Sequence, residues 1–336
     1  MAGKRSKKSS SKRKLKLIII NLVLFLVMQT AVGFAFSMPM VYYGPFANIK
    51  EVVVTTAMTT LTHQYLATWF LNDEDINSIM EKYAVHDENS QSDVNAISVT
   101  DADIEKKDDQ VELVNISNSK VKGYILLIKN PSMVKVATST KIGTQGMKLL
   151  DMVKENNAIG GINSGGFGDD GGHGTGGIPM GLLMQDGKVL YGDAKQTYQI
   201  IGFNEDSQMV LGRYTIAQAK QNRIKDAVTF GPYLVVNGQG LIKSNTDTPG
   251  SLQPRTAIGQ KKDGTVIMLV IDGRQPSSLG ASLKDVQDIM LQYGAYNAAN
   301  LDGGSSTTMV YQDQIINSPC SQYGPRSLPS AFIITR

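Results

Sequence analysis

The chain has 336 residues, of which 41% are hydrophobic, 33 are Lys or Arg and 30 are Asp or Glu. Eight of the cations lie in residues 1–16, so the rest of the chain carries 25 basic against 30 acidic residues, a net charge of −5, which argues against a nucleic-acid-binding protein. The single cysteine, Cys320, excludes an internal disulfide, and His63, His86 and His173 are too scattered for a zinc cluster, so we expect no metal and no cofactor.

The N-terminus combines a basic tail with a long apolar run. Residues 1–16 contain no acid, and the apolar run 17–36 has the ~20 residues that a helix needs to cross a bilayer. We interpret residues 17–36 as an uncleaved transmembrane signal anchor, with a cleavable signal peptide as the alternative. The positive-inside rule then predicts a single-pass cell-membrane protein with a cytoplasmic N-terminus and an extracellular main domain. An outside domain without disulfides is typical of a bacterial cell envelope.

The segment after the anchor is predicted to be helical and then polar. Apolar residues recur at helical spacing between residues 47 and 84, and Asn72–Asp75 breaks the pattern, so residues 37–84 are interpreted as a helical arm or stalk. Residues 85–109 are polar and acidic and are interpreted as a linker or exposed loop.

Residues 110–336 are predicted to form one α+β domain: a mixed sheet with much antiparallel strand and a strand–helix–strand unit near the C-terminus. Strands are predicted at 111–117, 121–130, 133–139 and 158–163, and a helix at 144–156. Asp186-Gly187, Asn237-Gly238 and Asp263-Gly264 each lie between apolar runs and predict hairpins.

A glycine-rich stretch, residues 160–177, follows the last of these strands. It contains G-x-G-x-x-G at Gly166, Gly168 and Gly171, but Ile178-Pro179 follows where a dinucleotide fingerprint requires a helix. A P-loop lysine is absent, and the calcium-repeat pattern occurs once, although such repeats must stack. The stretch is therefore either a mobile surface loop or a backbone surface for a ligand.

Residues 265–301 read as strand, helix and strand. Ser282–Asp285 fits a capping box, and Gly294 is placed to end the helix. A helical crossover returns the second strand parallel to the first, so Asp272 and Asp302, which follow the two strands, should lie at the same sheet edge. Either aspartate alone would be a turn-former. At matching strand ends, the two together predict site carboxylates.

Two arginines lie on weakly charged loops next to proline and glycine. Arg255 lies within Pro254–Gly259, and Arg326 follows Gly324-Pro325. The planar guanidinium suits a phosphate or carboxylate, and main-chain N–H groups of a glycine loop bind anion oxygens. Two arginines, two aspartates and a glycine loop fit a site for a sugar and a phosphate.

With these residues in place, residues 110–336 resemble the phosphodiester glycosidase family. The matching segments, in the family's order, are NSGGF (163–167), IPMGL (178–182), FGPYLV (230–235), PRTAIG (254–259), DGR (272–274), LDGGSS (301–306) and GPR (324–326). The combination of LDGGSS and PRTAIG is fairly specific. Ser164 departs from the family's usual glycine, which puts the sugar specificity in question more than the chemistry.

The resemblance implies hydrolysis between a sugar anomeric carbon and a phosphodiester oxygen, on cell-envelope or exopolysaccharide glycans. It implies Asp302 and Asp272 as catalytic residues. The implied substrate-binding residues are Arg255, Asn163, Gly165, Gly166, Gly231, Gly303, Gly304, Ser305 and Arg326. The partners implied are a sugar-1-phosphodiester or envelope glycopolymer and, through residues 17–36, the membrane. Three alternatives remain open: a non-catalytic glycopolymer-binding domain of the same fold, a phosphodiesterase that attacks phosphorus, and a structural envelope protein whose important part is the arm.

Overall fold

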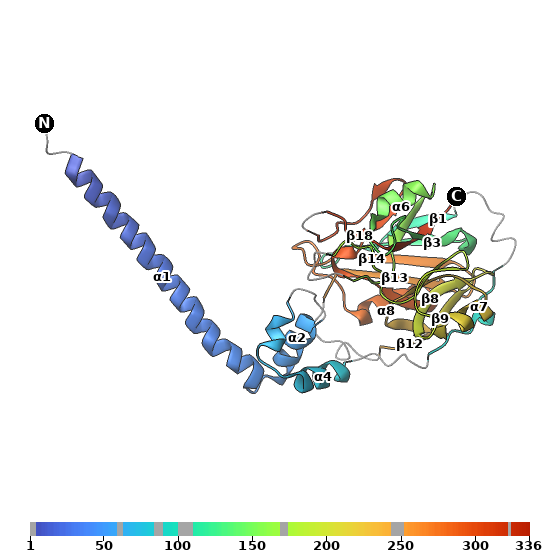
Figure 1. Cartoon of the computed structure of the whole chain (residues 1–336), viewed down its shortest axis with the longest axis horizontal. Helices are drawn as coiled ribbons and strands as arrows, with labels where there is room; N and C mark the ends of the chain where they lie inside the picture. The colour runs from blue at the N-terminus through green and yellow to red at the C-terminus, as the bar shows by residue number, and fades with distance from the viewer. Residues whose placement is uncertain are drawn as a thin grey trace.

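The computed structural model describes residues 5–58, 63–83, 90–99, 110–168, 174–242, 252–321 and 324–336, with side chains from residue 14 onward. The predictions for residues 1–4, 59–62, 84–89, 100–109 and 169–173, which include part of the arm and of the glycine-rich stretch, lie outside these ranges. An N-terminal helix and a small helical cluster precede a β-rich domain, called here the β domain (described residues from 90 to 336) (Figure 1).

The first helix is longer than the predicted anchor. Its apolar part, residues 14–43, is long and apolar enough to cross a membrane, and its most apolar 18-residue window has no buried residue. Figure 1 shows this helix extending away from the β domain. Residues 37–43, expected in the arm, belong to it instead. The helices of this region are α1 (Arg5–Tyr43), α2 (Ala47–Met58), α3 (Tyr65–Thr68) and α4 (Asp73–Lys82).

The helical arm folds onto the end of α1. Tyr42, Val54, Ala67, Ile76 and Ile79 form its buried cluster. The predicted break occurs where expected, because the Asn72 side chain accepts a hydrogen bond from the Asp75 N–H and caps α4.

The β domain contains a seven-stranded sheet and two five-stranded sheets, and neighbouring described strands pair antiparallel. In order across the sheet, the seven strands are β1 (Val111–Asn115), β2 (Gly123–Ile128), β14 (Val266–Ile271), β13 (Arg255–Lys261), β15 (Ala295–Leu301), β11 (Tyr233–Val236) and β12 (Gln239–Gly240). All three predicted Xaa-Gly hairpins form, at 186–187, 237–238 and 263–264.

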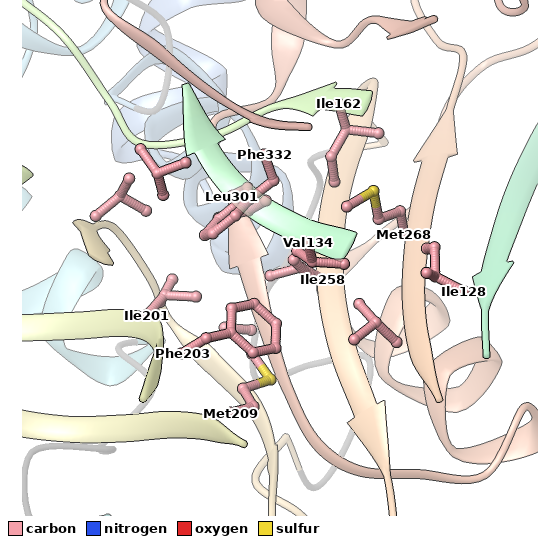
Figure 2. Close-up of a cluster of buried hydrophobic side chains, with 14 of the residues drawn as sticks. Ile128, Val134, Ile162, Ile201, Phe203, Met209, Ile258, Met268, Leu301 and Phe332 are labelled. Carbon is pink, nitrogen blue, oxygen red and sulfur yellow. The ribbon is translucent and has the colours of Figure 1, made fainter. Parts of the chain in front are cut away.

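The other sheets share the main core with the seven-stranded sheet. One contains β17 (Gln314–Ile315), β16 (Met309–Tyr311), β5 (Gly160–Asn163), β19 (Ser330–Ile334) and β3 (Val134–Thr138). The second contains β7 (Lys188–Tyr191), β6 (Leu183–Gln185), β10 (Ile224–Thr229), β8 (Thr197–Asn204) and β9 (Met209–Thr215), and a two-stranded pair joins β18 (Ser327–Leu328) to β4 (Met147–Lys148). Figure 2 shows side chains of all three larger sheets meeting, among them Ile162, Ile201, Ile258, Met268 and Phe332.

Three helices cover the outer faces. Helix α8 (Leu283–Gln292) packs Val286 and Met290 against the seven-stranded sheet, and its predicted capping box between Ser282 and Asp285 is present. Helix α6 (Leu149–Glu155) packs on the β5 sheet and α7 (Ile216–Gln221) on the β8 sheet. Helix α6 is shorter than the predicted 144–156, because residues 147–148 pair with β18 as a strand.

The fold is α+β, as expected, but part of the predicted linker packs on the β domain. Residues 90–99 contain the short 3-10 turn Val94–Ala96, and Ile97, 2% exposed, belongs to the main core. The backbone N–H of Ser92 donates to Leu211 and that of Ser98 donates to Lys262. One buried apolar side chain and these backbone bonds hold a segment whose polar composition indicated an exposed linker.

Candidate active site

The candidate site is built at the ends of β14 and β15. Both strands pair antiparallel with β13, so they run in the same direction and finish at one edge, as expected. They are not neighbours, because β13 lies between them, which separates their ends by about 10 Å. At this edge Arg255 pairs with Ile271, and Thr256 pairs with Leu301. The structure therefore brings Asp272, Asp302 and the start of β13 together.

Asp272 is buried and held by hydrogen bonds. It is 2% exposed, and its Oδ1 accepts from the Asn317 amide at 2.9 Å and from the Ser318 N–H at 3.0 Å. Burial raises the pKa of this carboxyl, and the bonds from Asn317 and Ser318 act in the opposite direction. Asp272 thus fixes the 317–318 segment against the end of β14.

Asp302 is only partly buried, and both its backbone N–H and its backbone carbonyl are hydrogen-bonded. Its N–H donates to the Ser164 carbonyl at 3.0 Å, and its carbonyl accepts from the Asn163 amide at 2.5 Å. The β5 end and the β15 end are therefore joined directly, which fixes the Cα from which the Asp302 carboxylate projects.

The Asn163 side chain forms hydrogen bonds to several of the segments that meet here. It is fully buried, and its Oδ1 accepts from the Thr256 hydroxyl at 2.8 Å and from the Thr308 N–H at 3.0 Å. Its side chain connects β5, β13 and the segments on both sides of the 303–306 loop. Substrate binding by Asn163 stays a prediction; the contacts show that its side chain holds these segments together.

The Gly303–Ser306 loop follows Asp302 directly. Gly304 has φ +58°, and its N–H donates to the Pro254 carbonyl at 3.0 Å. A Cβ on Gly303 would lie 2.7 Å from that same oxygen. Glycine is therefore required at both positions, because the loop lies directly on the segment that leads into β13.

Two arginines lie against this loop. The Arg326 guanidinium donates to the Ser305 hydroxyl at 3.3 Å and lies over the Phe167 ring at 5.3 Å. The Arg274 guanidinium lies about 3.5 Å from where a Gly304 Cβ would be. Two guanidinium groups beside a glycine loop provide the kind of N–H donors that bind an anion.

Arg255 lies behind the strand ends. It is 8% exposed, and its Nε donates to the Ala281 carbonyl at 3.0 Å. Burial, and then the nearby Arg274, lower its pKa to about 10, which leaves the guanidinium charged at neutral pH. Because Arg255 pairs with Ile271 of the α8-side cluster, it lies on the helix-covered side of the sheet.

The described parts of the glycine-rich stretch form a second wall of the site. Phe167 bridges to Pro179, and the Met180 N–H donates to Gly166 at 2.9 Å. A Cβ on Gly166 would lie 2.8 Å from the Phe230 ring, and a Cβ on Gly165 would lie 3.1 Å from the Thr229 carbonyl. These glycines permit close packing on the 229–230 segment.

Gly231 continues that wall toward β15. Its carbonyl accepts from the Asn300 amide at 2.9 Å, and a Cβ on it would lie 2.8 Å from the Gln199 amide. Its position links the β8 sheet to the strand that carries Asp302.

A cleft of about 520 Å³ lies beyond the glycine-rich stretch. Gly181 lies at its boundary, and the partly exposed Leu190 and Tyr191 contribute apolar surface. Its lining residues are Gly181, Leu190, Tyr191, Gly192, Asp193, Gln196 and Tyr198. Neither Asp272 nor Asp302 lines it, so the cleft is separate from the strand-end site. Within the described ranges, no group of three or more His, Cys, Asp or Glu side chains is placed to hold a metal ion.

Three contributors to this site were not singled out from the sequence. The sequence position of Arg274 was a usable signal, because it follows Asp272-Gly273 at the end of a buried strand. In the structure Arg274 has φ +57°, a conformation that is rare for residues other than glycine. Asn317 and Ser318 carried none, because their contact with Asp272 spans about 45 residues of chain.

Comparison with known proteins shows the family to which the chain is related. The sequence profile of the phosphodiester glycosidase family matches residues 156–335. The SPbeta prophage-derived uncharacterized protein YomE of Bacillus subtilis is 31% identical over 196 residues, which cover 54% of this chain and 29% of that protein. The mouse N-acetylglucosamine-1-phosphodiester alpha-N-acetylglucosaminidase is 24% identical over 156 residues, covering 42% of this chain and 30% of the enzyme. The matched part thus spans less than a third of either curated relative.

A solved structure shows the same fold. The zebrafish N-acetylglucosamine-1-phosphodiester alpha-N-acetylglucosaminidase catalytic domain, auto-inhibited by its pro-peptide, superimposes with a TM-score of 0.59 at 20% identity. The superposition covers 69% of this chain and 85% of that domain. Because the family profile matches more than half of the chain, and the expected motifs lie around one sheet edge, this chain belongs to the phosphodiester glycosidase family.

Proposed function

We propose that the chain is a membrane-anchored hydrolase that cleaves the bond between a sugar anomeric carbon and a phosphodiester. One observation carries the proposal: a partly exposed carboxylate, Asp302, immediately precedes a glycine loop flanked by Arg274 and Arg326. A carboxylate beside an anion site is what this reaction needs, because the anomeric carbon and the phosphate are joined by a single oxygen.

Asp302 is assigned to the anomeric centre, as nucleophile or general base. As the C1–O bond breaks, its electron pair leaves with the phosphate, and positive charge develops on the sugar ring. As general base, the Asp302 carboxylate stabilises that charge and takes the proton of the water that forms the new C1–O bond. As nucleophile, it forms a C1–O bond itself, which breaks when water replaces it, and the water proton passes to the departing carboxylate. Since a phosphomonoester is a good leaving group, strong general-acid help is unnecessary, and Asp272 is assigned to holding the site in shape from its buried position.

The phosphate is assigned to the Gly303–Ser306 loop. The Ser305 hydroxyl and the guanidinium groups of Arg274 and Arg326 supply donors for its oxygens. Arg255 adds buried positive charge behind the loop. These contacts strengthen as charge moves onto the phosphate in the transition state.

The rest of the substrate is assigned to the second wall and the cleft. Gly165 and Gly166 are buried and let this wall pack closely on the 229–230 segment, and Gly231 is partly buried. The cleft beside Gly181 offers the aromatic face of Tyr191 together with Asp193 and Gln196. Aromatic faces and carboxylate or amide groups are the usual partners of sugar rings. An envelope or exopolysaccharide glycan with a sugar-1-phosphodiester linkage fits both parts.

The location follows from α1. Its exposed apolar stretch and the basic N-terminus favour a single-pass anchor with the tail in the cytoplasm and the β domain outside the cell. The substrate would then be met at the outer face of the cell membrane.

Activity of the full chain on a panel of sugar-1-phosphodiesters, with free sugar as the readout, tests the proposal. Asp302→Asn is the test variant, and Asp313→Asn, in the exposed β16–β17 turn, is its matched control. Hydrolysis that Asp302→Asn abolishes and the control retains supports the assignment. A non-catalytic glycopolymer-binding protein would bind the substrates and release no sugar in any form.

A further inference from the structure

The helical arm packs back against the C-terminal part of α1. Phe70, which follows α3, stacks on Tyr42 with ring centroids 4.6 Å apart and also reaches Phe34 at 6.2 Å. The hydroxyls of Tyr42 and Tyr43 donate to the carbonyls of Leu66 and Phe70. The α3 segment is therefore fixed against the last turns of α1 and does not extend away from them as a stalk.

The position of Phe34 fixes the depth of this contact. About 20 residues of helix span the hydrocarbon core, at about 1.5 Å per residue. Counting from Lys16, the last cation before the apolar run, the core would end near Phe36. Because Phe70 contacts Phe34, the α3 segment lies at the outer boundary between hydrocarbon and headgroups.

Four of the side chains exposed at this level are aromatic. Trp69 is 70% exposed, Tyr43 69%, Phe46 47% and Tyr65 41%. The Tyr65 and Trp69 rings lie 4.9 Å apart. Trp and Tyr are enriched at membrane–water interfaces, where their rings meet the hydrocarbon boundary and their polar atoms meet water.

We propose that Tyr43, Phe46, Tyr65 and Trp69 form an interfacial aromatic patch that embeds in the headgroup region of the outer leaflet. The patch holds the arm against the bilayer, and the exposed Asp73, Glu74 and Asp75 of the first turn of α4 follow it along the chain. The inference rests on the membrane anchoring by α1 proposed above and is independent of the reaction at Asp302.

Trp69 is the only tryptophan of the chain, so its fluorescence reports on this patch alone. The full chain is reconstituted in phosphatidylcholine vesicles, and lipids carrying bromine either near the headgroup or near the chain ends are added. The patch predicts blue-shifted emission that the shallow bromines quench at least about twofold more than the deep ones, with weak quenching by aqueous acrylamide. Trp69→Phe gives the signal-free baseline, and Phe70→Ala, which removes the contact with α1, should reduce the bromine quenching.

Two results would overturn the patch. Strong acrylamide quenching without bromine quenching would place Trp69 in water, and protection from both quenchers would place it inside a protein contact such as a second copy. Resistance of α1 to carbonate extraction is measured on the same vesicles. An extracted protein shows that the anchoring itself has failed, whereas a retained protein with an unquenched Trp69 shows that only the patch is wrong.

Discussion

The two aspartates at the strand ends have the same sequence context and different surroundings. Each follows a buried strand and precedes a glycine, and the strands they end run in the same direction on either side of β13. Asp272 is 2% exposed and accepts bonds from Asn317 and Ser318, whereas Asp302 is partly exposed beside a glycine loop and two arginines. The segments that pack on an Asp-Gly strand end therefore decide whether its carboxylate is buried or partly exposed.

The largest effect is expected from Asp302→Asn. The amide keeps the size of the side chain but cannot carry negative charge toward the developing cation, so kcat should fall by at least ~10³-fold. The melting temperature should stay unchanged, because the main-chain bonds to Ser164 and Asn163 remain. Steady-state kinetics and thermal unfolding of this variant and of Asp313→Asn measure both. Activity within a few-fold of wild type would remove Asp302 from the reaction.

Substitutions of Arg326 and Arg255 should have different effects on activity and stability, because one lies against the loop and the other behind the strand ends. Arg326→Lys keeps the charge but loses the fork, so we expect kcat/KM to fall about 10- to 100-fold at unchanged stability. Arg255→Lys should also reduce turnover and should in addition lower the melting temperature, because the buried Nε bond to Ala281 is lost. An Arg255→Lys protein that is as stable and as active as wild type would contradict its place behind the site.

The raised pKa of Asp272 should make the stability of the protein depend on pH. Burial raises its pKa in the folded protein, so the folded state holds a proton that the unfolded state releases. The stability that Asp272 contributes is thus complete at low pH and is lost as pH rises through the raised pKa. From about pH 4 to pH 7, wild type should lose melting temperature relative to Asp272→Asn. A difference that is constant with pH would show that the carboxyl is not perturbed.

The smallest effect is expected in the cleft. Tyr191→Ala removes an exposed aromatic face about 37% accessible, so KM for an extended glycan should rise a few-fold while kcat is kept. A short synthetic sugar-1-phosphodiester, which ends before the cleft, serves as the control and should be hydrolysed equally by both proteins. Equal loss on both substrates would place Tyr191 at the strand-end site instead.

The parts of the fold that depend on local sequence could be predicted. The β14–α8–β15 unit, its Ser282–Asp285 capping box and the Xaa-Gly hairpins follow from spacing and turn chemistry within a few residues. The insertion of β13 between β14 and β15 could not, because sequence order does not fix strand order.

For the candidate site, the strand-end rule correctly placed Asp272 and Asp302 at one sheet edge but did not predict that their surroundings differ. The contact of Asn317 with Asp272, and that of Arg274 with the Gly304 loop, depend on long-range packing that no local pattern encodes. The same limit applies to Ile97, whose burial in the main core is decided by the surface it meets rather than by its polar neighbours.

The most direct test of the proposed reaction is the identity of the bond that breaks. The full chain hydrolyses a sugar-1-phosphodiester in water labelled with heavy oxygen, and the phosphomonoester product is analysed by mass spectrometry. Cleavage between the anomeric carbon and oxygen leaves the original oxygens on phosphorus, so the phosphomonoester should be unlabelled. Heavy oxygen in the phosphomonoester would mean attack at phosphorus, and the chain would then be a phosphodiesterase built on a glycosidase fold.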